Sequence, residues 1–398
     1  MRALLRHPAV LPWAVAAAFA GAVLLLASHD VYWIADFTTE SLPAYQALID
    51  GRLSLYFERI PAYAGFATIV GGPASLLTGL FGREETMVFR LIALPGLIGL
   101  AAIGTTLAVP ARAAGRRYWW LFAVMGMGGV LTYSTLTYGH PEDLLAAAGA
   151  VGAVLAARSG RVGWAGALLV VGVLAKQWAV LAILPAAFAA PRGALRIVAA
   201  GAAGTLVAVA LPFLFAREGG ATVTSTGLMF HPHQIWWPFG VPAAPDFIKA
   251  GHGTRMGPGW LQPLTRPLIV ASGAALALVW RLRSGRERNR DDALGVLALA
   301  MLLRCMLDPW DLVYYHVPLI VALAAWEARR GRELPVLSVA ASACAWLTFV
   351  VYDAHTGDGP YFAYLAWTLP LAGVLALHLL RGARREERMP AAAVPVPA

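Results

Sequence analysis

Long apolar runs separated by short polar segments dominate this chain. A helix needs about 20 apolar residues to cross the roughly 30 Å hydrocarbon core of a membrane. About twelve runs approach that length, near residues 9–28, 88–110, 118–137, 143–157, 163–175, 177–190, 196–215, 264–282, 292–307, 312–327, 335–352 and 362–380. The pattern predicts an all-α membrane protein whose residues 1–380 form a single bundle of about twelve transmembrane helices.

Lysine and arginine residues indicate how this bundle is oriented. Basic residues concentrate in the cytoplasmic loops of membrane proteins. Most of the 31 basic residues here lie at the two ends of the chain and in every second connection between runs. We therefore expect both termini in the cytoplasm, with residues 381–398 as a basic, Pro/Ala-rich tail. The expected outside segments are 29–87, 138–143, 216–263, 308–311 and 353–361.

Residues 61–81 form one more apolar run, which could count as a further span. Counting it would invert the orientation of every later span and place the next arginine cluster outside. A central Gly-Gly-Pro would also break a spanning helix and leave backbone groups unsatisfied in lipid. We predict that this run is instead an interfacial or re-entrant element of the first outside loop, 29–87.

Composition supports a membrane protein and argues against other classes. Of 398 residues, 59% are hydrophobic and 13% charged, whereas soluble proteins average about a quarter charged. The formal net charge is +9, but the basic residues form no patch with interleaved aromatics, so we expect no nucleic-acid partner. Cys305 and Cys344 lie in apolar runs and are predicted core residues. No nucleotide-binding glycine motif occurs on the cytoplasmic side.

Acidic residues gather in the first outside loop, close after the first span. They are Asp30, Asp36, Glu40, Asp50 and Glu58. A carboxylate just above the membrane and beside apolar residues is partly desolvated, which makes it a better general base. A solvated loop acid without chemistry is the alternative for any one of them. Within the same loop, residues 41–50 are expected to form a short interfacial helix that ends at a glycine.

The segment after the first span resembles a known family. It has the pattern D-F-x-x-x-x-x-P-x-Y-x-A-L-x-x-G-x-x-x-x-Y, carried by Asp36, Phe37, Tyr45, Ala47, Leu48, Gly51 and Tyr56 and followed by Pro73 and Arg90. With its span order, the chain resembles the GT-C superfamily of membrane glycosyltransferases. It is most similar to the bacterial polyprenol-phosphate-mannose-dependent α-mannosyltransferases, glycosyltransferase family 87. The resemblance implies a GT-C-like fold, Asp36 as general base and no cofactor. Asp30 is the rival base.

Polar residues at two later outside turns extend this candidate site. His140 and Glu142 lie in the turn between the third and fourth spans, where Pro141 can open the next helix and Glu142 suits its N-terminus. Lys176 and Gln177 follow an apolar run in which a cation is costly. Lys176 either snorkels to the interface or meets the phosphate of a lipid-linked donor. We expect Lys176 and His140 to contact that phosphate, and Glu142 and Gln177 to position substrate.

The long outside loop contains the sequence FHPHQIWWPFG. Its His231 and His233, together with Arg255, are candidates to bind the donor phosphate. The H-x-H spacing also invites a metal, but no third ligand accompanies it at a characteristic spacing, and no metal is predicted. Trp236 and Trp237 are either interface anchors or a platform that positions the sugar.

A last candidate pair lies at the end of the ninth predicted span. Arg304 and Asp308 are spaced i, i+4 and could neutralise each other within the membrane or position substrate.

These observations favour one function and leave an alternative open. We expect transfer of a hexosyl group, with mannose as the first choice, from a polyprenyl-phosphate-linked sugar to an acceptor hydroxyl of a lipid or glycan. The reaction would take place at the outer face of a cell membrane, among membrane lipids. The alternative is a multi-span transporter or a flippase for lipid-linked sugars, which would use Arg304 and Lys176 along its substrate path.

Overall fold

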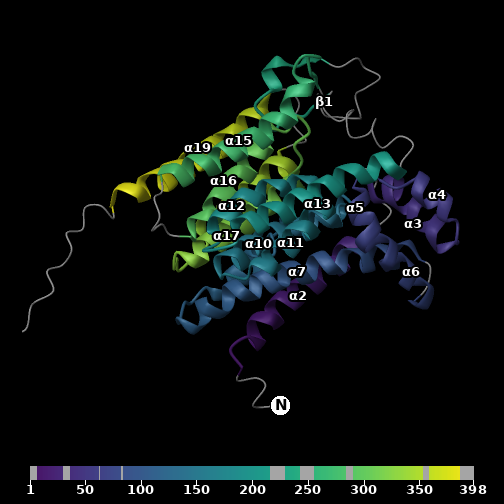
Figure 1. Ribbon diagram of the computed structural model, residues 1–398, viewed down its shortest axis with the longest axis horizontal. Coiled ribbons are helices and arrows are strands. Elements are labelled where there is room, and N and C mark those ends of the chain that lie inside the picture. Colours follow the sequence, from purple (N-terminus) through teal and green to yellow (C-terminus); the bar gives the residue numbers. More distant parts are fainter. Residues whose placement is uncertain are drawn as a thin grey trace, which may run out of the picture.

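The computed structural model shows a bundle of helices packed roughly side by side (Figure 1). The structure describes residues 7–29, 36–61, 63–81, 84–215, 229–242, 255–283, 290–352 and 358–385. The bundle helices are α2 (Val10–His29), α7 (Glu85–Ala113), α8 (Trp119–Met125), α9 (Leu131–Thr137), α10 (Pro141–Arg158), α11 (Val162–Ala175), α12 (Ile183–Ala189), α13 (Ala194–Phe215), α15 (Gln262–Arg283), α16 (Asp292–Leu307), α17 (Val317–Arg329), α18 (Val336–Trp346) and α19 (Gly359–Arg385).

Shorter elements join these helices. They are the 3-10 turns η4 (Gln177–Ala182), η5 (Trp237–Phe239) and η7 (Val313–His316), the π turns η2 (Phe37–Ser41), η3 (Ala67–Gly71) and η8 (Leu347–Val351), and the first-loop helices α3 (Leu42–Ile49), α4 (Leu53–Glu58), α5 (Ala64–Phe66) and α6 (Gly72–Phe81). Three two-residue strands, β1 (Met229–Phe230), β2 (Val241–Pro242) and β3 (Arg255–Met256), form a small antiparallel sheet in the order β1-β3-β2.

The predicted all-helical bundle is confirmed, since each of the twelve predicted spans coincides with a helix or with consecutive helical pieces. Among the described residues, five helices are long and apolar enough to cross a membrane: α2, α7, α13, α15 and α19. Others are shorter or interrupted. The span predicted at 118–137 is two helices, because Gly128 and Gly129 adopt positive φ between α8 and α9. The number of crossings therefore stays a prediction.

The apolar run at 61–81 differs from its prediction. Gly71-Gly72-Pro73 does not break the helix, because the π turn η3 leads directly into α6 and Pro73 sits in the first turn of α6. There the missing proline N–H costs little. The two glycines allow close packing instead: a Cβ on Gly71 would lie 2.2 Å from the hydroxyl of Tyr45 in α3. The predicted interfacial helix at 41–50 is present as α3, which ends at Ile49, and the chain turns at Gly51, whose φ is +74°.

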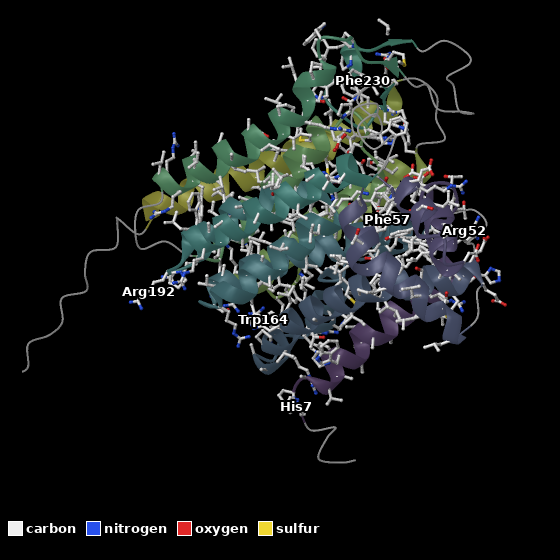
Figure 2. The ribbon with its side chains drawn as sticks, turned by 45° about the vertical axis from the view of Figure 1, so that its right-hand side comes forward. His7, Arg52, Phe57, Trp164, Arg192 and Phe230 are labelled. Atoms are coloured by element: carbon white, nitrogen blue, oxygen red, sulfur yellow. The ribbon has the colours of Figure 1, made fainter. Side chains whose placement is uncertain are left out.

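The two ends of the bundle carry different residues. The first-loop helices α3, α4 and α6 lie together at one end in Figure 1. In Figure 2, Arg52, Phe57 and Phe230 lie toward that end, whereas Arg192 and Trp164 lie at the opposite end. The first-loop residues and the arginine-rich turns thus lie at opposite ends of the bundle, and which end faces outside stays a prediction.

Small residues bring the site-bearing helices close together. A Cβ built on Gly149 of α10 would lie 2.7 Å from the Cα of Gly172 in α11, and one on Gly65 of α5 would lie 2.4 Å from the Leu174 carbonyl oxygen. Gly-mediated backbone approach is common between membrane helices. It places the N-terminus of α10, the C-terminus of α11 and the first-loop helices against one another.

Candidate active site

Asp36 lies beside His140, although 104 positions separate them in sequence. Asp36 precedes the π turn η2, and Gly139, with φ +85°, turns the chain so that His140 stands directly before α10. The Nε2 atom of His140 is 3.0 Å from Oδ2 of Asp36. The His140 side chain is 7% exposed, whereas that of Asp36 is 40% exposed. Asp36 is therefore the member of the pair that a substrate can reach.

His140 also contacts Glu142 through its other ring nitrogen. Nδ1 lies 2.7 Å from Oε1 of Glu142, which is buried in the first turn of α10. Burial alone would lower the pKa of His140, but the Glu142 carboxylate and the hydrogen bonds to Asp36 and Glu142 raise it to about 9. His140 is thus an imidazolium at neutral pH, and it can donate to both carboxylates.

Lys176 continues this chain of contacts. It follows the last residue of α11, and its Nζ donates to Oε1 of Glu142 at 2.7 Å and lies 3.3 Å from Oδ2 of Asp143. Trp178 Nε1 donates to the other Asp143 oxygen at 2.7 Å. Lys176 does not snorkel, since it points inward and 15% of its side chain is exposed. Its charge is balanced by two carboxylates.

Aromatic rings enclose the charged residues. Tyr314 of η7 stacks on His140 with ring centroids 4.3 Å apart, and the ring of Tyr63 lies 4.6 Å below the Lys176 ammonium. The Tyr63 hydroxyl is 2.6 Å from Ser41 Oγ in η2, which ties the Asp36 segment to the same shell. These contacts shield the ion pairs from water and strengthen their electrostatic interactions.

Arg304 lies near this cluster without an ion pair to Asp308. Its guanidinium lies over the rings of Tyr315 and Trp178, at 4.1 and 5.1 Å, and donates to the Tyr315 carbonyl oxygen. Asp308 instead follows the end of α16, and its Oδ1 accepts from the Trp310 amide. In the described part of the chain, the predicted i, i+4 ion pair is therefore replaced by stacking on aromatic rings.

Arg255 belongs to a second group of polar and aromatic side chains. Its guanidinium stacks on Trp237 at 4.3 Å and lies 2.9 Å from Oδ1 of Asp358. Trp237 Nε1 donates to the same carboxylate oxygen at 2.7 Å. These contacts connect the described part of the long loop between α13 and α15 to the start of α19. The sequence pattern around Asp358 does not indicate this contact.

The two histidines of the H-x-H sequence face different surroundings. His231 lies edge-on to Trp310 at 4.3 Å, and His233 is buried against Phe349 at 3.9 Å. Trp236 donates to the Leu307 carbonyl oxygen and is half-buried. Gln177, at the start of η4, is also half-buried. The rival base Asp30 lies outside the described residues.

Three members of the site are not evident from the sequence. Tyr63 and Tyr314 read as ordinary apolar or interfacial aromatics, and Trp178 as a membrane anchor. The K-Q-W sequence at 176–178 offered one clue, because an indole N–H beside an intramembrane lysine can satisfy the carboxylate that the lysine requires.

His140, Glu142 and Asp143 each offer one ligand atom within 4.8 Å of the others, so a metal is a possible interpretation of the cluster. However, the Lys176 ammonium already lies between the two carboxylates. The lysine ammonium thus occupies the position in which a metal ion would neutralise the two carboxylates. The arrangement is suited to holding Asp36 and an imidazolium side by side, which is a geometry for proton transfer.

The charge on His140 predicts a pH-dependent stability. Because its pKa rises from 6.5 to about 9 in the folded chain, its stabilising contribution is complete below 6.5 and is lost as the pH rises through about 9. His140→Gln should remove this component. Thermal unfolding midpoints measured across that range should fall more steeply for the wild type than for the variant. Equal slopes would contradict the raised pKa of His140.

Comparison with known proteins identifies one family whose sequence model matches this chain. The sequence model of glycosyltransferase family 87 matches residues 62–309. The matched range includes His140, Glu142, Lys176 and Arg304, and Asp36 precedes it. Searches of the curated proteins and of the solved structures returned no match.

Proposed function

Because the chain belongs to glycosyltransferase family 87, we propose that it transfers a hexosyl group, with mannose as the first choice, from a polyprenyl-phosphate-linked sugar to an acceptor hydroxyl. The acceptor is a membrane lipid or a lipid-anchored glycan. One observation carries this proposal: a half-exposed carboxylate, Asp36, is held by a buried chain of charges at the end of the bundle where the first-loop helices lie.

Asp36 acts as the general base. As the acceptor oxygen bonds to the anomeric carbon, its proton passes to the Asp36 carboxylate, and the bond between that carbon and the phosphate oxygen breaks. The polyprenyl phosphate leaves with the bonding electrons, and attack from the opposite face inverts the anomeric centre. His140 holds the carboxylate in position through its Nε2 contact. Glu142 and Lys176 hold His140 in turn, as positioning residues.

The donor phosphate requires cations that can be reached from outside. Lys176 and His140 already face carboxylates. Arg255 is 27% exposed and is paired with the more exposed Asp358. We therefore propose Arg255 as the first candidate for the phosphate, with His231 on the same loop and Lys176 as a secondary contact. Trp236 and Trp237 border this region and are candidates to position the sugar.

The proposed topology can be tested with a matched pair of arginines. Arg52 and Arg192 lie at opposite ends of the bundle in Figure 2, and both are exposed. In intact cells of a Cys344→Ser background, a membrane-impermeant maleimide should label Arg52→Cys. Arg192→Cys should react only after the membrane is permeabilised. Labelling in the reverse order would show that the topology is the opposite of the proposed one, with the site on the cytoplasmic face.

The donor is tested with purified wild-type protein in proteoliposomes. Radiolabelled hexose should pass from polyprenyl-phosphate mannose to a lipid extract of the native membrane, and nucleotide sugars should give no product. Transfer from a nucleotide sugar would contradict the proposed donor. Movement of the lipid-linked sugar across the bilayer without transfer would favour the flippase instead.

A further inference from the structure

A second buried group of polar side chains lies on the other side of η7 from the candidate active site. It comprises Cys305 near the end of α16, Asp311 in the following loop and His316 at the end of η7. All three are fully buried. Each offers one ligand atom, and these atoms lie within 4.8 Å of one another. The proposed transfer reaction uses none of them.

The burial of the Asp311 carboxylate is only partly compensated, by the nearby Tyr364 hydroxyl and Leu312 backbone amide. In the described part of the chain, neither of its oxygens makes a hydrogen bond of normal length and geometry. The Tyr364 hydroxyl lies near this carboxylate and 3.4 Å from His316 Nε2. The Arg304 guanidinium is held on Tyr315 and Trp178. A buried carboxylate without a close ammonium or guanidinium is costly, and charged groups in protein interiors are normally paired or bound to a metal.

The two buried groups differ in their counter-ions. His140, Glu142 and Asp143 are equally close together, but the Lys176 ammonium contacts both carboxylates. Among the described residues, no ammonium or guanidinium forms an ion pair with Asp311, and His316 Nε2 lies 3.6 Å from its Oδ2. That separation is close to the ~3.3 Å expected between two ligands that each lie about 2.0–2.1 Å from a tetrahedral ion.

We propose that Cys305, Asp311 and His316 bind one Zn²⁺ ion, with the fourth coordination position facing Tyr364. Sulfur, nitrogen and oxygen ligands in one tetrahedral set suit zinc. On binding, the Cys305 thiol releases its proton and its sulfur bonds to the metal, His316 coordinates through neutral Nε2, and Asp311 coordinates as a carboxylate. The ion neutralises the buried carboxylate.

The site would fix the wall of the candidate active site. His316 follows Tyr314 and Tyr315 directly in η7. Tyr314 stacks on His140, and the Tyr315 ring and carbonyl oxygen contact Arg304. A metal bound to Cys305, Asp311 and His316 would thus connect α16, the loop that follows it and η7, next to the tyrosines that contact His140 and Arg304. This proposal rests on side chains outside the transfer machinery and does not depend on the donor.

The test uses the full chain in detergent, purified with a tag that contains no histidine. Elemental analysis should find about one zinc per chain. After the zinc has been removed with a chelator, added Co²⁺ should produce a cobalt–thiolate charge-transfer absorption. This absorption should disappear when Zn²⁺ displaces the Co²⁺. Cys305→Ser should abolish that absorption, and the isosteric Asp311→Asn should weaken metal binding at least tenfold. The control is Cys344→Ser, since Cys344 is half-buried and outside the group. It should behave as wild type.

Two outcomes would overturn the proposal. One is a monodisperse wild-type protein that contains no zinc and gives no cobalt–thiolate band. The other is a Cys305→Ser variant that binds Co²⁺ as tightly as Cys344→Ser does. If Cys305→Ser fails to fold, Asp311→Asn decides the question. Its side chain keeps the size of the carboxylate, and unchanged metal affinity in this variant would equally contradict the site.

Discussion

Asp36→Asn should lower the rate of hexose transfer by about 10²–10⁴-fold, the range typical for removal of a general base. Asparagine keeps the shape of the side chain and can still accept a hydrogen bond from His140 Nε2, which lies 3.0 Å from the native carboxylate. It cannot take a proton from the acceptor hydroxyl. We therefore expect the loss in kcat, with the KM for the lipid-linked donor changed little.

The matched control for Asp36→Asn is Asp50→Asn in the same loop. Asp50 is an exposed carboxylate paired with Arg52, with 45% of its side chain accessible. Its replacement removes the same charge from the loop and should leave transfer within about twofold of wild type. Asp30→Asn tests the rival base. If it abolished transfer while Asp36→Asn did not, the assignment of the base would be wrong.

Lys176→Met should destabilise the fold by about 3–5 kcal/mol, the cost of breaking a buried ion pair from one side. Lys176 contacts Glu142 at 2.7 Å and Asp143 at 3.3 Å, and both carboxylates are buried. Without the ammonium, two negative charges remain in a site with one imidazolium. The free energy of unfolding, measured by reversible denaturation in detergent, should show this loss.

Two further variants serve as controls for Lys176→Met. Arg52→Met breaks the exposed Arg52–Asp50 pair and should cost less than about 1 kcal/mol. Adding Glu142→Gln to Lys176→Met removes one of the stranded charges and should recover part of the loss. If Lys176→Met cost no more than Arg52→Met, Lys176 would not be the counter-ion of the buried carboxylates.

Hydropathy predicted the helices well, because it follows from the lipid that surrounds the chain. Every predicted span contains helix. The details that failed are local. Gly-Gly-Pro at 71–73 was expected to break a helix, yet Pro73 lies in the first turn of α6 and Gly71 leaves room for Tyr45. Such accommodation depends on the packing partner, which hydropathy does not identify.

The candidate site could be predicted only in part. Each of Asp36, His140, Glu142 and Lys176 was notable by itself, as a loop acid, a turn histidine, a helix-start acid and an intramembrane cation. Their pairing was not predictable, because it depends on close approach of α10, α11 and the first-loop helices. The i, i+4 spacing of Arg304 and Asp308 suggested an ion pair, but Tyr315 and Trp178 compete successfully for the guanidinium.

The most direct test of the account is single-turnover transfer from a preformed complex of the protein with polyprenyl-phosphate mannose. Wild type, Asp36→Asn and Asp50→Asn should bind the labelled donor to the same extent. On addition of acceptor lipid, wild type and Asp50→Asn should release product at similar rates, and Asp36→Asn at a rate at least ~100-fold lower. Equal rates for Asp36→Asn and wild type would contradict the proposal that the carboxylate held by His140 is the catalytic base.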